Sequence, residues 1–217
     1  MTTLSMLQAS VQGTLQDAAY TPTILANHIN SGLRRCAYLV LLPDLETTGI
    51  VITNPSSSSV EIPGDWNFCR NLYAAHIADN PEIQVLSSMG LLRMQVPDID
   101  NTVHEGDVNF ITTRKTNIIY ANSPAEPKTL VCKFYENPTL LVNPTHVPSE
   151  LPESLQEPLL VNYALWKCFE SIEDGIEGAK VNTAYYKNEF SEAINELLEI
   201  FTAGQSTPTP NRDSAWV

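Results

Sequence analysis

The sequence predicts an α+β protein in which helices at both ends of the chain flank a central region of short strands. Three observations carry this prediction. Apolar residues recur at helical spacing near the N-terminus and again over residues 151–201. Between these regions, short apolar runs alternate with Gly, Pro and Asn in the manner of strands and turns. The order helices, strands, helices is typical of a domain whose terminal helices pack together beside a small sheet.

Two helices are expected in segment 1–45. The first carries a stripe of apolar residues spaced three and four apart, namely Leu4, Leu7, Val11 and Leu15. The second begins at Thr21, which can cap a helix, and Pro22, which suits a first helical turn. It ends by Pro43, because the residue before a proline is restrained from the helical conformation.

Segment 46–148 is expected to form a small antiparallel β-rich domain. Its strand-like runs are Ile50–Thr53, Val60–Ile62, Gln84–Leu86, Leu91–Val96, Val108–Thr112, Ile118–Tyr120 and Thr129–Tyr135. Asp65–His76 is helical or irregular, since only some of its apolar residues have helical spacing. Prolines then recur through an extended linker that leads to the last helices.

Segment 149–202 is expected to form a helical hairpin that packs on the N-terminal helices. Pro158 predicts a kink in its first helix, or a helix start near Glu157. Gly175 and Gly178 make a short break, so the two helices should be antiparallel. The inner face of the second helix is expected to carry Val181, Ala184, Tyr185, Ile194, Leu197, Leu198 and Phe201.

The charge of the chain argues against binding of nucleic acid by attraction. The formal net charge is −13, whereas phosphate contacts need Lys and Arg. Residues 150–201 carry 11 acidic side chains against three lysines, so one surface should be strongly acidic. The outer face of the second hairpin helix carries Lys187, Glu189, Glu192, Glu196 and Glu199. A solvated helix face is the simplest interpretation of such a run.

The cysteines and the N-terminus indicate a protein made in a reducing compartment. Cys36, Cys69, Cys132 and Cys168 are scattered in apolar settings and lack metal-ligand spacing, so free thiols are expected. No basic segment followed by an apolar core marks a signal peptide. The longest apolar run is too short to span a bilayer.

No motif predicts a catalytic, cofactor-binding or metal-binding site, and the chain is not expected to be an enzyme. A phosphate loop, GxSxG and GxGxxG are all missing from the sequence. The densest polar group consists of Asp98, Asp100, His104, Glu105 and Asp107. A metal or ligand could bind there, but turns that flank strands are the more usual setting for such residues.

Segment 203–217 is expected to form a flexible C-terminal arm. It holds two prolines and small polar residues, with little apolar content before Ala215, Trp216 and Val217. Such a segment buries too little surface to fold by itself. Trp216 either has no role or is an anchor, because Trp is enriched at the hot spots of interfaces.

Four groups of short segments carry a resemblance to a known family. They are Ile24–Asn30 with Leu33–Arg35, Leu42–Leu45 with Val60–Pro63, Pro127–Tyr135 with Asn137–Pro138, and Leu151–Ala164 with Ala184–Tyr186 and Phe190. In this order they resemble the first long helix, the start of the sheet, the closing strand and the C-terminal helices of the head–tail connector (adaptor) proteins of tailed bacteriophages. The resemblance covers most of the chain, although Asp65–His76 and the serine-rich loop have no counterpart in it.

The resemblance implies a structural virion protein at the head–tail interface, made in the host cytoplasm. Such proteins form a ring, typically of twelve copies, beneath the portal; they extend the DNA channel, retain the genome and dock the tail. The implied partners are the portal protein, tail or nozzle proteins and further copies of the chain. DNA passes through without sequence-specific binding, and neither a cofactor nor a membrane is involved.

Two expectations about residues join the resemblance to the sequence. Glu189, Glu192, Glu196 and Glu199 are candidates to face the lumen of the channel, where acids would repel DNA. The arm is expected to dock on the portal through Trp216, with Val217, Arg212 and Pro210 beside it. Two alternatives stay open: another tail component, such as a nozzle or tail terminator, and a non-viral ligand-binding module with a polar site near Asp98–Asp107.

Overall fold

The computed structural model of the protein describes residues 2–55, 57–69, 72–77, 80–100, 103–174 and 180–203. Its contacts divide the chain into two compact units. The helical unit combines Met1–Pro43 with Pro138–Val217, and the sheet unit comprises Asp44–Asn137. The predicted α+β class, with helices, strands and helices in that order along the chain, is confirmed.

The described residues of the helical unit form α1 (Leu4–Leu15), α2 (Pro22–Leu39), α4 (Glu153–Ile172) and α5 (Val181–Ala203). The hydroxyl of Thr3 accepts a hydrogen bond from the backbone N–H of Met6 at the start of α1. The hydroxyl of Thr21 does the same for Ile24, and Pro22 opens α2, as predicted. The first two helices therefore begin where their local sequence signals place them.

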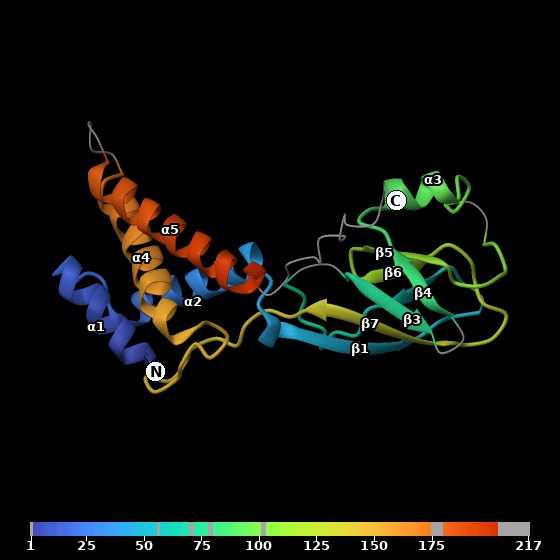
Figure 1. Ribbon diagram of the computed structural model, residues 1–217, viewed down its shortest axis with the longest axis horizontal. Helices are drawn as coiled ribbons and strands as arrows, with labels where there is room; N and C mark the ends of the chain where they lie inside the picture. Colours follow the sequence, from blue (N-terminus) through green and yellow to red (C-terminus); the bar gives the residue numbers. More distant parts are fainter. Residues whose placement is uncertain are drawn as a thin grey trace, which may run out of the picture. The chain divides into compact units, whose positions relative to one another are not determined.

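Helix α4 is the centre of the helical unit, because it packs against α1, α2 and α5 (Figure 1). Buried residues lie around most of its circumference: Leu155, Gln156, Leu159, Leu160, Val161, Tyr163, Ala164, Leu165 and Cys168. The ring of Phe169 stacks on Tyr186 with centroids 5.4 Å apart, and Trp166 lies 6.1 Å from Phe190. A later residue of α4 thus meets an earlier residue of α5, so the hairpin is antiparallel, as expected.

Two details of the hairpin differ from the prediction. Pro158 lies inside α4, which begins at Glu153 rather than near Glu157. Pro158 has no N–H to donate to the carbonyl of Ser154, four residues earlier in the helix, yet α4 continues through this position. The inner face of α5 consists of Phe190, Ala193, Ile194 and Leu197, whereas Val181, Ala184, Tyr185 and Leu198 are exposed. Apolar residues occur on both sides of α5, and only contact with α4 selects the buried side.

Residues 138–151 run along the helices as an extended segment that backbone hydrogen bonds hold in place. The N–H of Leu4 donates to the carbonyl of His146 at 2.8 Å, and the N–H of Ser5 donates to that of Pro144 at 3.0 Å. The buried amide of Gln156 donates to the carbonyls of Pro148 and Leu151, both at 3.1 Å. Two free N–H groups of α1 are satisfied in this way.

The sheet unit contains one curled sheet of seven strands in the order β1-β7-β3-β4-β5-β6-β2 (Figure 1). A 3₁₀ turn, Pro43–Leu45, leads into the first strand. The strands are β1 (Glu46–Ile52), β2 (Ser59–Glu61), β3 (Ala74–Ile77), β4 (Asn80–Val85), β5 (Phe110–Arg114), β6 (Asn117–Tyr120) and β7 (Thr129–Tyr135). All their described pairings are antiparallel except that of β4 with β5, which is parallel.

Two segments of the sheet unit correct the sequence-based expectation. Leu91–Val96 is not a strand: α3 (Met89–Gln95) occupies this stretch, and the hydroxyl of Ser88 accepts from the N–H of Leu91 at its start. A short apolar run cannot by itself distinguish a strand from a buried helical turn. The helical alternative for Asp65–His76 is wrong, because its described residues are irregular until β3 begins at Ala74.

An aromatic cluster fills one end of the sheet core. Trp66 stacks on Phe134 with centroids 5.0 Å apart, and Phe68 meets Phe134 edge-on at 4.6 Å. Gly49 of β1 lies directly against the indole, since a Cβ there would come within 2.1 Å of Cζ2 of Trp66. Glycine is therefore required at this position of the strand for the indole to lie flat on it.

Candidate functional site

The acidic residues between Asp98 and Asp107 do not converge on a common centre. Arg93 holds Asp100 with Nε–Oδ2 and Nη2–Oδ1 distances of 2.6 and 3.2 Å, and Arg114 Nη1 lies 3.7 Å from Oδ1. Asp98 Oδ1 lies 2.9 Å from His104 Nε2. The bonds to His104 and Arg93 hold the pKa of Asp98 and Asp100, respectively, below their ordinary values.

These contacts give the polar group a structural explanation. Each of the two aspartates already has its own partner without a ligand: Arg93 neutralises the charge of Asp100, and His104 is hydrogen-bonded to Asp98. Within the described ranges, no group of three or more His, Cys, Asp or Glu side chains is arranged to hold a metal ion. The geometry thus favours the interpretation as residues of turns next to a sheet.

Two histidines of the helical unit also have structural settings. His146 Nδ1 accepts from the N–H of Val142 at 3.2 Å, and its Nε2 lies 2.9 Å from Asn143 Nδ2. His28 is half-buried in α2, where burial and then the nearby Lys167 lower the pKa of its imidazole. His28 is therefore neutral at physiological pH.

Cys36, Cys69, Cys132 and Cys168 form no disulfide, and all of them except Cys69 are buried. Burial raises the pKa of the thiols of Cys36, Cys132 and Cys168 to about 12 in each case. A buried thiol with so high a pKa is not a nucleophile at neutral pH. These side chains therefore serve as small apolar residues of the core.

The solvent face of α5 is strongly acidic. Glu189, Glu192, Glu196 and Glu199 recur at spacings of three and four, which places them on one side of the helix. This side is opposite the buried residues Phe190 and Leu197. Among the described residues, none of the four glutamates forms an ion pair, in contrast to Glu170, which pairs with Lys167 at 2.7 Å. The predicted acidic face exists, but its position in an assembly is a separate matter.

The candidate arm lies outside the residues that can be described. α5 ends at Ala203, and Pro210, Arg212, Trp216 and Val217 all follow this point. The docking role of these residues stays a prediction from the sequence.

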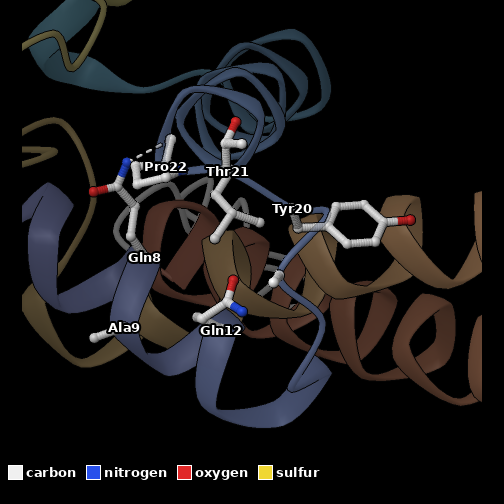
Figure 2. A pocket seen from close by; sticks show the side chains of 8 residues that line it. Gln8, Ala9, Gln12, Tyr20, Thr21 and Pro22 are labelled. Atoms are coloured by element: carbon white, nitrogen blue, oxygen red, sulfur yellow. Dashed lines mark hydrogen bonds between the residues drawn. The ribbon is translucent and has the colours of Figure 1, made fainter.

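Two pockets that sequence reasoning missed lie next to each other on α1 and α2. The first, of about 400 Å³, is lined by Gln8, Ala9, Gln12, Ala18, Tyr20, Thr21, Pro22 and Leu25 (Figure 2). The second, of about 380 Å³, extends over Leu4, Gln8, Pro22, Thr23, Ala26, Asn27, Asn30, Leu140, Leu141, Val142 and Pro144. Gln8 and Pro22 belong to both, and Gln8 Nε2 donates to the carbonyl of Pro22 at 2.7 Å (Figure 2).

The pockets could have been suspected from composition. Residues 1–33 contain a single side chain that is charged at neutral pH, Asp17, in a chain with 12 basic and 25 acidic side chains. A surface helix without charges is unusual, and depletion of charge is a property of interface cores. The signal is an absence of charged side chains, and no sequence motif contains such an absence.

The described helices give no sign of a membrane span, since none of them is both long and apolar enough to cross a bilayer. No curated protein matches the chain in sequence. The sequence model of the family described as SU10 adaptor protein matches residues 1–213, which is nearly the whole chain. This is a family of phage head–tail adaptors, structural components of the virion, in agreement with the resemblance found in short segments of the sequence. The chain belongs to the SU10 adaptor protein family.

Proposed function

We propose that the protein forms a ring of about twelve copies beneath the portal, extends the DNA channel and provides the platform on which the tail docks. Membership of the adaptor family supports a position at the head–tail junction. The observation that carries the channel role is the solvent face of α5 with Glu189, Glu192, Glu196 and Glu199, none of which forms an ion pair with another residue that the structure describes.

The four glutamates destabilise α5, and folding of the single chain gives no reason for their presence. Like charges three or four residues apart destabilise a helix by about 0.2–0.5 kcal/mol per pair. Glu199 also lies close to the last turn of α5, where the helix dipole favours cations. Because these charges lower the stability of the helix, the acidic face is well suited to a role that the chain has only in an assembly.

Repulsion of DNA is that role. Duplex DNA carries one phosphate charge for about every 1.7 Å of its axis. From Glu189 to Glu199 the helix rises by about 15 Å. A copy whose α5 runs along the channel therefore presents carboxylates over about 15 Å of the duplex. In a ring, this wall of acids keeps the phosphates from binding, and the duplex slides without a preferred position. Basic side chains at the same places would hold the DNA instead.

A charge reversal tests the channel role. The variant E192K/E196K replaces two acids of the α5 face, and E61K/E126K is the matched control with the same change in net charge at exposed positions of the sheet unit. Assembled particles of both variants are compared for the rate of genome ejection. We expect E192K/E196K to slow ejection and the control to behave as the parent protein. Equal ejection rates for the two variants would exclude α5 from the channel wall.

The arm is proposed to anchor the ring on the portal through Trp216. Its composition supports this idea, since prolines and small polar residues lead to a terminal Trp216-Val217 pair, with Arg212 and Pro210 just before it. Deletion of residues 204–217 leaves α5 complete, because the helix ends at Ala203. We expect the truncated protein to keep its helical content and melting temperature but to lose assembly onto portal rings.

Single substitutions refine the test of the arm. W216A should weaken portal assembly strongly, whereas W216F keeps a large aromatic ring and should retain most of it. Native mass spectrometry of portal mixtures counts the bound copies for each variant. A truncated protein that joins portal rings normally would refute the arm hypothesis.

A further inference from the structure

One surface of the helical unit carries no charge at all. It consists of α1, residues 22–33 of α2 and the extended segment 138–149, and we call it the uncharged face. None of these residues is Asp, Glu, Lys or Arg. The charged residues beside them are Asp17, in the turn between the helices, and two residues of α4: Glu157, which accepts a hydrogen bond from Ser10, and Lys167, near His28. A stretch of this length would normally carry several charges in a chain that is 17% charged.

The three segments form a continuous surface rather than separate patches. The first turn of α1 is hydrogen-bonded to the extended segment through Leu4 and His146 at 2.8 Å. The side chain of Asn30 in α2 bonds to the backbone of Leu141 in the same segment. Gln8 connects α1 to the carbonyl of Pro22 in α2. The charge-free residues are therefore brought together by the fold.

The uncharged face is exposed, apolar in part and hollowed. The side chain of Val142 is 75% exposed and that of Met6 is 55% exposed. Leu140 and Ile24 are exposed beside them. The two pockets on α1 and α2 open on this face, and Leu25 is a buried residue that lines the first of them. Exposed apolar residues around pockets, without charges, are the features of the core of a protein–protein interface.

The histidines do not alter this description. His28 is neutral because burial and Lys167 lower the pKa of its imidazole. The ring of His146 is occupied by Val142 and Asn143 of its own loop. His28 therefore adds no charge to the face at physiological pH.

The charge of the chain indicates which partner suits such a face. A copy of net charge −13 repels any other copy, so two copies gain by touching only where neither presents acids. A partner of a different sequence can meet the abundant acidic surface with basic residues and has no need of a neutral one. A neutral surface on a strongly acidic chain is thus best matched by another copy of the same chain.

We propose that the uncharged face is the surface through which one copy binds the next copy of this chain. The proposal deepens the proposed function, on which it rests, by assigning the contact between neighbours of the ring. A closed ring joins two different surfaces of each copy, so the uncharged face is one half of every contact. The other half belongs to a different surface of the next copy.

A cross-linking experiment identifies the occupant directly. A photo-reactive benzoylphenylalanine replaces Ala18, which is exposed and lines the first pocket. The full chain is irradiated alone at high concentration and again in the presence of portal rings. We expect a product of twice the 24.0 kDa chain mass. A product with the portal protein in place of a two-copy product, or no product in either preparation, would overturn the proposal.

Charge insertion supplies the matched variants. A9E and T23E each place a carboxylate at an exposed position that lines a pocket, and N195E places one at an exposed position of α5. We expect A9E and T23E to reduce the two-copy product about tenfold or more, because an unpaired charge is costly in an interface core. N195E should leave it unchanged. Circular dichroism checks that all three variants keep the helical content of the parent chain.

The experiments separate this inference from the proposed function. If the parent chain forms the two-copy product but does not assemble on the portal, the contact between copies stands and the portal role fails. If the chain binds the portal but A9E and T23E cross-link as well as N195E does, the portal role stands and the uncharged face is not the contact. Added salt should increase the two-copy product, since it screens the repulsion between acidic copies without weakening a neutral contact.

Discussion

The side-chain amide of Asn30 pairs with both backbone polar groups of Leu141, in the way that one strand pairs with another. Asn30 Nδ2 donates to the carbonyl of Leu141 at 3.0 Å, and the N–H of Leu141 donates to Asn30 Oδ1 at 2.8 Å. The two residues are 111 positions apart in the chain. This amide fixes the extended segment against α2 and thereby completes the rim of the second pocket.

Removal of that amide should loosen the segment. In N30A, the N–H and the carbonyl of Leu141 both lose their partner, and each unsatisfied buried group costs about 1–3 kcal/mol. We expect a lower free energy of unfolding and a marked loss of hydrogen-exchange protection at the Leu141 amide. N27A, at an exposed position one turn earlier in α2, is the control and should change neither quantity by much. Unchanged exchange at Leu141 in N30A would show that the segment is held by other contacts.

Glu173 should make the hairpin sensitive to acid. Its carboxylate accepts hydrogen bonds from the backbone N–H groups of Asn182 and Thr183, both at 3.1 Å, and from the hydroxyl of Thr183 at 2.7 Å. These bonds, with that of the Thr183 hydroxyl first, lower the pKa of Glu173 below its ordinary value. The carboxylate thus satisfies N–H groups at the start of α5 that have no partner within the helix.

The sign of the pH effect follows from the lowered pKa. The stabilisation by Glu173 is complete above the pKa that the group has in the unfolded chain, and it is lost as the pH falls through the lower pKa of the folded state. E173Q should therefore reduce the urea midpoint at pH 7, and the difference from the parent chain should shrink as the pH falls below 4.5, the ordinary pKa of the group. E126Q, the same substitution at an exposed position of the sheet unit, is the control and should leave the midpoint at pH 7 unchanged. A difference that stays constant with pH would mean that the charge of Glu173 is not involved.

Two helical glycines should respond in opposite directions to the same substitution. A Cβ on Gly32 would lie 3.0 Å from Cδ1 of Tyr163, where α2 crosses α4, whereas a Cβ on Gly13 meets nothing within 4 Å. G13A should stabilise α1 by about 0.5–1 kcal/mol, because alanine loses less conformational entropy on folding. G32A should destabilise by about 1–3 kcal/mol through crowding at the crossing. Urea unfolding of the two variants measures both effects, and an equal gain for both would refute the close approach of α2 and α4.

The α5 glutamates should be unfavourable for the isolated chain. E192Q removes repulsion from Glu189 and from Glu196, at spacings of three and four. We expect the free energy of unfolding at low salt to rise by about 0.2–0.5 kcal/mol for each repulsive pair removed. The gain should fade in 1 M NaCl, where the Debye length is about 3 Å. N195Q on the same face is the control, and a gain that persists at high salt would point to a cause other than charge.

Local signals were sufficient for most of the helices and for part of the sheet. Thr21 and Pro22 begin α2 as expected, because capping and proline geometry act within one turn of the chain. The strand predicted at Thr129–Tyr135 is β7, in which Leu130, Cys132 and Phe134 are buried because side chains alternate between the faces of a strand. The acidic face of α5 could be foreseen for a similar reason: helical spacing alone places the four glutamates together.

The sequence by itself thus determined the α+β class, the order of the elements, the free cysteines and the acidic helix face, because each depends on residues within a few positions of one another. Only the tertiary structure decided which side of α5 is buried, that Leu91–Val96 belongs to a helix, and that Asp100 is neutralised by Arg93 and Arg114. The uncharged face also needed the fold, since α1, α2 and residues 138–149 are joined by contacts such as that of Asn30 with Leu141. The physical reason is common to all of these cases: packing and pairing between distant residues choose among alternatives that local propensity leaves nearly equal in free energy.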